Sequence, residues 1–329
     1  MSSQNTDSHW FFWNNDRFIP FAQQPTPTEA FPSPSNPFPA ALLYGYSVFT
    51  TFCFCAQRPL QAHWLNEHLL RLAQNARQLD MTLPTDLETL QHDLLQGLYP
   101  TLCKPSQANA STAWRVRLTL FPQVSQWSQL IKAPSLPGSL WLLASPLAPF
   151  AKPTIHWPAH LALFTACYSK PLPTLKHGSL CEALLLERQR YQNQQKTTGL
   201  PPADTSHPGQ LQQETVWLQP DGMVTETTTG NIFAYINGAW QTPLRSVSLA
   251  GVAQTAIMAC GQQQLPTPIQ HQAFCLQQLQ QAEGVFVSNS VQLIRPVGQI
   301  NHQAIPWSSI ARKQTQMLAE HLWQAFYSP

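Results

Sequence analysis

The sequence predicts a mixed α/β (α+β) protein built from two domains. A chain of 329 residues is longer than a single hydrophobic core usually supports. Segments with strand-like and helix-like patterns follow one another along most of its length. Prolines punctuate the stretch SPLAPFAKP at 145–153, which lies between two strand-like runs and is typical of a linker. We therefore expect a smaller N-terminal domain over 1–147, a linker over 148–153 and a larger C-terminal domain over 154–329.

The N-terminal domain begins with a proline-rich region, 1–40, that we expect to be partly irregular. The β-branched and aromatic run at 44–55 then predicts a strand. A helix follows, because its apolar residues are spaced by three and four: Leu65, Leu69, Leu72, Ala76 and Leu79. A second helix is predicted at 85–99, with Thr85 as its N-cap. Two further strands are predicted from alternating patterns, at 114–122 and 139–147.

The C-terminal domain should begin with a strand at 160–168 and a helix at 179–195. Residues 200–214 show no periodicity and are predicted to form a surface loop. The following stretch has the pattern of a β-meander, with Asp221-Gly222 and Asn237-Gly238 as its hairpin turns.

Three elements complete this domain. A helix is predicted from Ser248, its expected N-cap, to Gly261. The run GVFVSNSVQLIRPV at 284–297 is strand-like, and 308–326 is a closing helix.

Composition excludes several classes of function. Charged residues make up only 10% of the chain and the net charge is +2, without the basic stripe that nucleic-acid binding needs. No apolar run reaches the ~18 residues of a membrane span, and the N-terminus lacks the pattern of a secretory signal. The seven cysteines are scattered and odd in number, so we expect reduced thiols and a cytoplasmic protein. Cys53 and Cys55 form the only close pair and lack further ligands, so no metal site is expected.

Two segments carry the residues best suited to catalysis. LKHGSLCEALLLERQ contains Lys176, and VTETTTGNIFAYINGAWQTP contains Glu226. A lysine can bond a carbonyl carbon as a Schiff base, and a carboxylate can keep a pyridine nitrogen protonated. Enzymes that use pyridoxal 5′-phosphate (PLP) cannot easily lack these two groups. An exposed lysine at a helix start and a solvated acid at a strand end are the plainer alternatives.

Two further segments could bind an anion. SLAGVAQTAI places a glycine-containing turn at the start of a helix, where backbone N–H groups and the helix dipole favour negative charge. Ser288, Asn289 and Ser290 could donate hydrogen bonds to a phosphate, although an Asx turn at a strand end is the simpler explanation.

The order of these segments resembles class IV aminotransferases, the PLP enzymes of fold type IV. This family includes branched-chain and D-amino-acid aminotransferases and 4-amino-4-deoxychorismate lyase. The resemblance extends from about Tyr44 to Pro296 and includes a His-x-x-Arg-Leu helix at His68, Arg71 and Leu72. Lys176-His177, Asn289-Ser290 and Arg295-Pro296-Val297 are most similar to the lyase.

The resemblance implies a role for each matching residue. Lys176 is then the catalytic Schiff-base lysine and Glu226 the partner of the pyridine nitrogen. The remaining cofactor contacts are expected to come from the residues that match the ring and phosphate side: Thr229, Val252, Ala253, Asn289 and Ser290. Arg115 and Arg117 lie on one side of a strand, where either could meet a substrate carboxylate, and a surface salt bridge is the alternative.

The sequence departs from the family pattern at several positions, among them Gly45-Tyr46-Ser47, where relatives tend to carry Gly-Asp-Gly. The family arginine expected to reach the phosphate falls on Cys53, and a thiol cannot reproduce the charge-assisted contact of a guanidinium. The active-site threonine of the lyase falls on Leu42, a candidate substrate contact.

Three functions therefore remain open. The first is 4-amino-4-deoxychorismate lyase, which eliminates pyruvate to give 4-aminobenzoate for folate synthesis. The second is a branched-chain or D-amino-acid aminotransferase, and the third is a non-catalytic relative with weakened phosphate binding. The resemblance also implies a homodimer.

Overall fold

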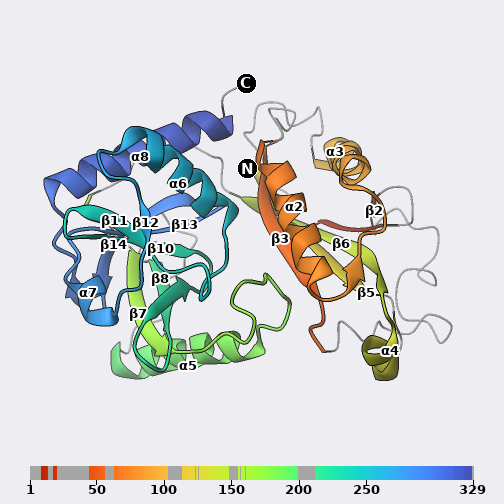
Figure 1. The fold of residues 1–329 in the computed structure, drawn as a ribbon, viewed down its shortest axis with the longest axis horizontal. Coiled ribbons are helices and arrows are strands. Elements are labelled where there is room, and N and C mark those ends of the chain that lie inside the picture. Colours follow the sequence, from red (N-terminus) through yellow and green to blue (C-terminus); the bar gives the residue numbers. More distant parts are fainter. Residues whose placement is uncertain are drawn as a thin grey trace, which may run out of the picture. The chain divides into compact units, whose positions relative to one another are not determined.

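The computed structural model describes residues 9–13, 18–20, 44–55, 63–102, 113–122, 124, 126–147, 155, 157–159, 161–198 and 212–327. They form a mixed α/β structure with two sheets, which confirms the predicted class (Figure 1). The chain divides into two compact units. Unit 1 comprises Met1–Ala151 with the short segment Leu175–Ser179, and unit 2 comprises Lys152–Thr174 and Leu180–Ser328. The predicted linker, 148–153, lies outside the described residues.

Unit 1 is a mostly antiparallel sheet with helices packed on it. The sheet order is β2-β1-β6-β5-β3, and β4 pairs with β6 in parallel. Helices α2 and α3 share the core with leucines of β5 and β6. The strands are β1 (His9–Trp13), β2 (Phe18–Pro20), β3 (Val48–Cys55), β4 (Met81–Thr82), β5 (Ala113–Pro122) and β6 (Leu136–Leu147). The helices are α2 (His63–Arg77), α3 (Leu87–Leu102) and α4 (Trp127–Lys132).

Unit 2 is a nine-stranded mixed sheet with the order β12-β11-β10-β13-β14-β7-β8-β9, and β15 pairs with β14. Helices α6 and α8 pack together beside β13 and β14 (Figure 1). The strands are β7 (Leu161–Cys167), β8 (Gln212–Leu218), β9 (Val224–Thr227), β10 (Asn231–Ile236), β11 (Ala239–Thr242), β12 (Gln270–His271), β13 (Val285–Asn289), β14 (Leu293–Ile300) and β15 (Gln303–Ala304). The helices are α5 (Cys181–Thr198), α6 (Val252–Gln264), α7 (Leu276–Gln280) and α8 (Ser309–Tyr327).

The apolar spacing of α2 correctly identified its buried face. Leu65, Leu69, Leu72 and Ala76 are all buried in the core of unit 1. Leu79 lies beyond the helix, which ends at Arg77 and leads into Asp80, a residue with a positive φ.

The N-caps predicted for α3 and α6 are wrong. Asp86, not Thr85, caps α3, since its Oδ1 accepts the Thr89 N–H at 2.9 Å. Ser248 does not cap α6, because its hydroxyl donates to the carbonyl of Leu244 instead. Gly251 takes that place, and α6 continues three residues past Gly261.

Two strand predictions are corrected by turns. Residues 284–297 form the hairpin of β13 and β14, with Asn289 paired to Leu293. The predicted meander is two separate hairpins, because β10 pairs with β13 rather than with β9. Both predicted Gly turns are present, with φ of +80° at Gly222 and +81° at Gly238.

The predicted surface loop 200–214 ends too late. Its last three residues belong to β8, and Glu214 is buried. The start of this strand was missed because its residues are polar and show no alternating apolar pattern. The buried partners of a polar residue cannot be recognised from sequence.

Candidate active site

Lys176 belongs to unit 1, whereas the sequence placed it in the C-terminal domain, because the segment Leu175–Ser179 is bonded to the start of β3 through an isolated β-bridge. The carbonyl of Lys176 accepts the Phe49 N–H at 2.9 Å, and the Gly178 N–H donates to the Ser47 carbonyl at 2.8 Å. His177 forms an antiparallel bridge with Val48 and is buried. The backbone of Lys176 is therefore held at both sides, while its amine lies 4.8 Å from the centroid of the Phe49 ring.

Helix α2 supplies the polar surroundings of Lys176. His68, Arg71 and Asn75 are spaced by three and four and so lie on one side of the helix. Asn75 accepts the backbone N–H of Lys176 at 3.0 Å. Thr50 bonds His68 Nδ1 at 2.7 Å and accepts from Arg71 at 3.1 Å.

His68 is held in its neutral form. It is fully buried, and burial, Arg71 and Lys176, in that order, place its pKa well below the ordinary value. Arg71 and Lys176 therefore both lie close enough to act on the same imidazole. Arg71, from the predicted His-x-x-Arg-Leu helix, is therefore a guanidinium in the surroundings of Lys176.

Arg115 and Arg117 lie side by side with β3 residues. Arg115 is opposite Cys53 and Arg117 opposite Thr51 in the antiparallel pair, and both side chains leave the sheet on the same side, as predicted. Arg117 stacks on the Phe49 ring, with Cζ 3.6 Å from its centroid, whereas Arg115 is exposed. Burial, then Arg115, lower the pKa of Arg117. Phe49 is thus shared by two cations, Arg117 and Lys176.

Two of the positions that depart from the family pattern are Cys53 and Leu42. Cys53 is buried and faces the same side of β3 as Phe49, with the guanidinium-bearing residue Arg115 across the strand pair. Leu42 lies outside the described residues.

Glu226 belongs to unit 2 and stands near the end of β9. One carboxylate oxygen, Oε1, lies 3.1 Å from Nζ of Lys170, and the other, Oε2, accepts the Leu249 N–H at 2.9 Å. Leu249 in turn offers its carbonyl to the Asn231 side chain at 2.8 Å. The turn that opens α6 is therefore tied to the ends of β9 and β10. Lys170 was not identified from the sequence, since a lysine six residues before Lys176 carries no recognisable signal.

The start of α6 is built to receive an anion. Val252 and Ala253 are the first two residues of a 13-residue helix, so their N–H groups have no acceptor within it, nor any backbone acceptor elsewhere among the described residues. A Cβ at Gly251 would come within 2.0 Å of Oδ1 of Asn231, so only glycine allows this close approach. These N–H groups and Glu226 are tied together through Leu249, which suits a ligand carrying both a phosphate and a basic nitrogen, as PLP does.

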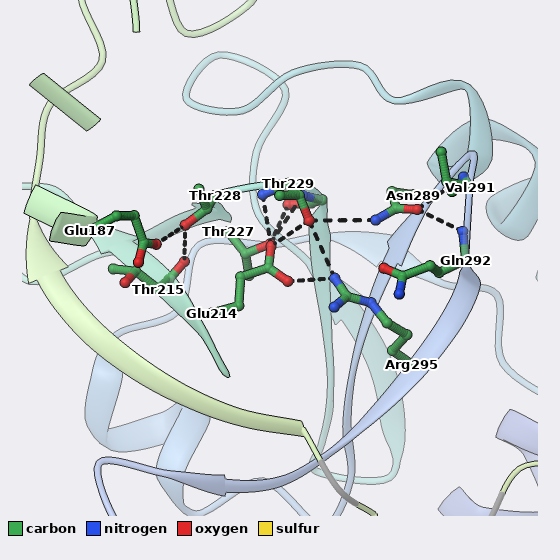
Figure 2. A network of polar contacts seen from close by, with 11 residues as sticks. Glu187, Glu214, Thr215, Thr227, Thr228, Thr229, Asn289, Val291, Gln292 and Arg295 are labelled. Carbon is green, nitrogen blue, oxygen red and sulfur yellow. Dashed lines mark hydrogen bonds and ion pairs between the residues drawn. The ribbon is translucent and has the colours of Figure 1, made fainter. Parts of the chain in front are cut away.

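The turns that contain Asn289 and Thr229 already form hydrogen bonds with protein groups (Figure 2). Asn289 Oδ1 accepts the N–H groups of Val291 and Gln292 at 2.9 and 2.8 Å, which is an Asx turn. Its amide nitrogen reaches Thr229 Oγ1 at 3.5 Å. Ser290 follows in the same turn and is partly exposed. Thr229 itself donates its hydroxyl and its N–H to Glu214.

The structure thus brings the predicted residues together in two groups. In unit 1, Lys176 is joined to Phe49, Arg117 and the side chains of α2. In unit 2, Glu226 is joined to the start of α6, and Thr229 to Asn289. Within the described residues, no helix is long and apolar enough to cross a membrane.

Comparison with known proteins identifies the family. The model of amino-transferase class IV matches residues 47–300. No curated protein matches the chain. Among solved structures, the chain is similar to the branched-chain amino acid aminotransferase of T.th. with pyridoxamine 5′-phosphate, at 17% identity and a TM-score of 0.68 over 97% of both chains.

Two other solved structures have a fold similar to that of this chain. A branched-chain aminotransferase of Thermoproteus uzoniensis with norvaline has 16% identity and a TM-score of 0.67 over 97% of this chain and 98% of its own. A hypothetical aminotransferase from Mycobacterium tuberculosis in its PLP-bound form has 15% identity and a TM-score of 0.65 over 97% of this chain and 99% of its own. The fold of this protein is therefore that of the class IV PLP enzymes, and the chain belongs to the class IV aminotransferase family, whose members use PLP.

Proposed function

We propose that this protein is a PLP-dependent lyase that converts 4-amino-4-deoxychorismate into 4-aminobenzoate and pyruvate, a step of folate synthesis. The observation that carries the proposal is the Lys176-His177 segment, in which a backbone-held lysine shares the Phe49 ring with Arg117. The lyase substrate carries carboxylates, and Arg117 is a partly buried cation that contacts the same Phe49 ring as the Lys176 amine. The Asn289-Ser290 and Arg295-Pro296-Val297 segments support the same choice.

The cofactor, when bound, supplies a pyridine ring that accepts the electron pair left by a broken substrate bond. Lys176 would hold the carbonyl carbon of PLP, and its released amine would take the proton from ring carbon C4 of the substrate. Departure of pyruvate then makes the substrate ring aromatic. Glu226 would keep the ring nitrogen protonated, and the N–H groups of Val252 and Ala253 would hold the phosphate.

The phosphate also needs a cation, which Cys53 does not provide. Arg71 is a candidate, because it acts together with Lys176 on His68. It also donates to the Thr50 hydroxyl at 3.1 Å, which holds the guanidinium beside β3. We propose that Arg71 contributes the guanidinium contact to the phosphate.

The second candidate is a branched-chain or D-amino-acid aminotransferase. It is favoured by the solved structures described above, which are largely branched-chain aminotransferases. The same Lys176 would move the proton between the amino-acid Cα and the cofactor. Arg117 would then bind a carboxylate of the amino or oxo acid.

The deciding experiment compares wild type with Lys176→Ala and with Lys132→Ala, an exposed lysine of unit 1. The purified proteins are given 4-amino-4-deoxychorismate, and 4-aminobenzoate and pyruvate are measured. We expect product from wild type and Lys132→Ala, and at least roughly a 10³-fold loss in Lys176→Ala.

A parallel reaction offers branched-chain or D-amino acids with a 2-oxo acid as acceptor. Amino transfer without any release of 4-aminobenzoate would replace the lyase by the aminotransferase. A protein that binds PLP but catalyses neither reaction would contradict both proposals and support a non-catalytic role.

A further inference from the structure

Three consecutive threonines after Glu226 all donate their hydroxyls to carboxylates (Figure 2). Thr227 donates to Glu214 at 2.6 Å, and Thr229 donates to the same oxygen at 2.8 Å. Thr228 points the other way and donates to Glu187. The turn between β9 and β10 is therefore hydrogen-bonded on two sides to acidic residues, Glu214 of β8 and Glu187 of α5.

Each of the two carboxylates is paired with an arginine. Glu214 forms an ion pair with Arg295 of β14, and Glu187 forms one with Arg190 at 2.9 Å. Glu214 is the more enclosed of the two, with 5% of its side chain exposed. Burial alone would raise its pKa, but Arg295 and the donors Thr227 and Thr229 outweigh burial, so its pKa lies below the ordinary value.

The hydrogen bond between Glu214 and Thr227 lies on the side of β9 opposite to the carboxylate of Glu226. Successive side chains of a strand point to opposite faces, and Thr225 and Thr227 are buried whereas Glu226 is partly exposed. Glu214 thus holds the strand end from the face opposite to the Glu226 carboxylate, whose two oxygens contact Lys170 and the Leu249 N–H. The Thr227 N–H also donates to the Gly230 carbonyl at 2.8 Å, which closes the turn.

We propose that Glu214, paired with Arg295, is a positioning residue that fixes the end of β9 and so directs the Glu226 carboxylate toward the cofactor ring. The inference rests on the role proposed above for Glu226. It does not depend on whether the enzyme is a lyase or an aminotransferase.

This arrangement also reassigns Thr229. Its hydroxyl proton and its N–H both go to Glu214, and its Oγ1 faces the donors Asn289 and Arg295 at 3.5 and 3.4 Å. Thr229 therefore acts as part of the turn rather than as a hydrogen-bond donor to phosphate. The phosphate contacts in unit 2 fall to the N–H groups at the start of α6.

The test uses two identical substitutions in unit 2, Thr227→Val and Thr165→Val. Thr227→Val removes a hydrogen bond to Glu214, and Thr165→Val removes the bond from Asn301 at 2.8 Å, elsewhere in the sheet. For each variant we would measure the melting temperature without PLP, the PLP dissociation constant by absorbance, and the pH dependence of the bound-cofactor absorbance.

We expect Thr227→Val to weaken PLP binding about tenfold and to shift the pH dependence of the absorbance, at a melting temperature similar to that of Thr165→Val. Thr165→Val should leave both cofactor properties as in wild type. Equal effects of the two variants on PLP binding, or none from Thr227→Val, would overturn the proposal.

Two further variants keep the result decisive. Glu226→Gln must itself change the pH dependence of the absorbance; if it does not, the role of Glu226 fails, and with it the positioning role. The double variant Glu214→Gln/Arg295→Met avoids leaving Arg295 without its acid and should show the same cofactor changes as Thr227→Val. Unchanged cofactor properties in this folded double variant would contradict the proposal while leaving Glu226 intact.

Discussion

Lys176 and Glu226 lie in opposite electrostatic surroundings. Around Lys176, unit 1 places Arg117 on the same aromatic ring and Arg71 on the same histidine. Around Glu226, unit 2 places the cation Lys170 on one oxygen and the Leu249 N–H on the other. The lysine is thus surrounded by like charge and the acid by groups of opposite polarity.

The difference suits the roles proposed for the two residues. Arg71 and Arg117 give unit 1 cations that can meet the anionic groups of a cofactor and a substrate. Lys170 and the Leu249 N–H fix the two oxygens of the Glu226 carboxylate, which is proposed to meet the pyridine nitrogen. The rigidity also differs in origin: backbone hydrogen bonds hold Lys176, whereas buried side-chain pairs hold the turn beside Glu226.

The largest expected effect comes from removing the charge of Glu226. Glu226→Gln keeps the size and loses the anion, so the pyridine nitrogen loses its proton and turnover should fall by on the order of 10²–10³. Steady-state kinetics measures this, with Glu283→Gln, an exposed acid of unit 2, as the control. Turnover within about threefold of wild type would show that the charge of Glu226 does not contribute to catalysis.

The next effect concerns the cations of unit 1 and the phosphate. Arg71→Met should weaken PLP binding by about 10–100-fold, because a charge-assisted hydrogen bond is lost. Cys53→Ser leaves the charge unchanged and should bind PLP as wild type does. Absorbance titration of both apo-proteins decides this, and equal affinities for wild type and Arg71→Met would remove Arg71 from the phosphate site.

Arg117 should act on the substrate rather than on the cofactor. Arg117→Met is expected to raise KM about tenfold or more with PLP affinity unchanged, since only the carboxylate contact is lost. Arg115→Met, the exposed neighbour, should change KM by less than about threefold. If both variants behave alike, the stacking of Arg117 on Phe49 has no role in binding.

The smallest effect is a difference in acid sensitivity between the two units. The pKa of His68 is lowered on folding, so the unfolded chain binds its proton first and unit 1 loses stability as pH falls below the ordinary histidine value of 6.5. The pKa of Glu214 is also lowered, so its contribution in unit 2 is present above the ordinary value of 4.5 and is lost as pH falls below it.

Hydrogen exchange followed by mass spectrometry can distinguish the two pH ranges, one governed by His68 in unit 1 and one by Glu214 in unit 2. Peptides of α2 should lose protection at a higher pH than peptides of β8, and His68→Gln should remove the upper window only. Simultaneous loss of protection in both units would mean that neither group governs local stability.

Much of the fold could be predicted from the sequence because periodicity reports which residues are buried. The spacing from Leu65 to Ala76 marked the core side of α2, and both Gly turns were found where a positive φ is required. The N-caps of α3 and α6 could not be predicted, because several polar residues near each helix start could serve. Asp86 and Gly251 were selected by the local path of the chain.

Some residues of the candidate site could likewise be predicted from the sequence and others could not. Lys176 and Glu226 could be named from sequence because their segments match a family pattern. Lys170, Glu214 and Glu187 could not, since a charged residue outside a recognised motif normally lies on the surface. Their contacts with Glu226, with the threonines that follow it and with Arg295 span 13 to 81 residues along the chain.

The sequence by itself determined the two-domain α/β class, the resemblance to the family and the two residues suited to the ends of the PLP ring system. Short-range pattern and residue chemistry are sufficient for these. Only the tertiary structure decided that Lys176 is bonded to β3 in unit 1, and that the threonines after Glu226 donate to the carboxylates of Glu214 and Glu187. The physical reason is that hydrogen bonds and ion pairs depend on distances between strands, which the order of residues along one strand does not contain.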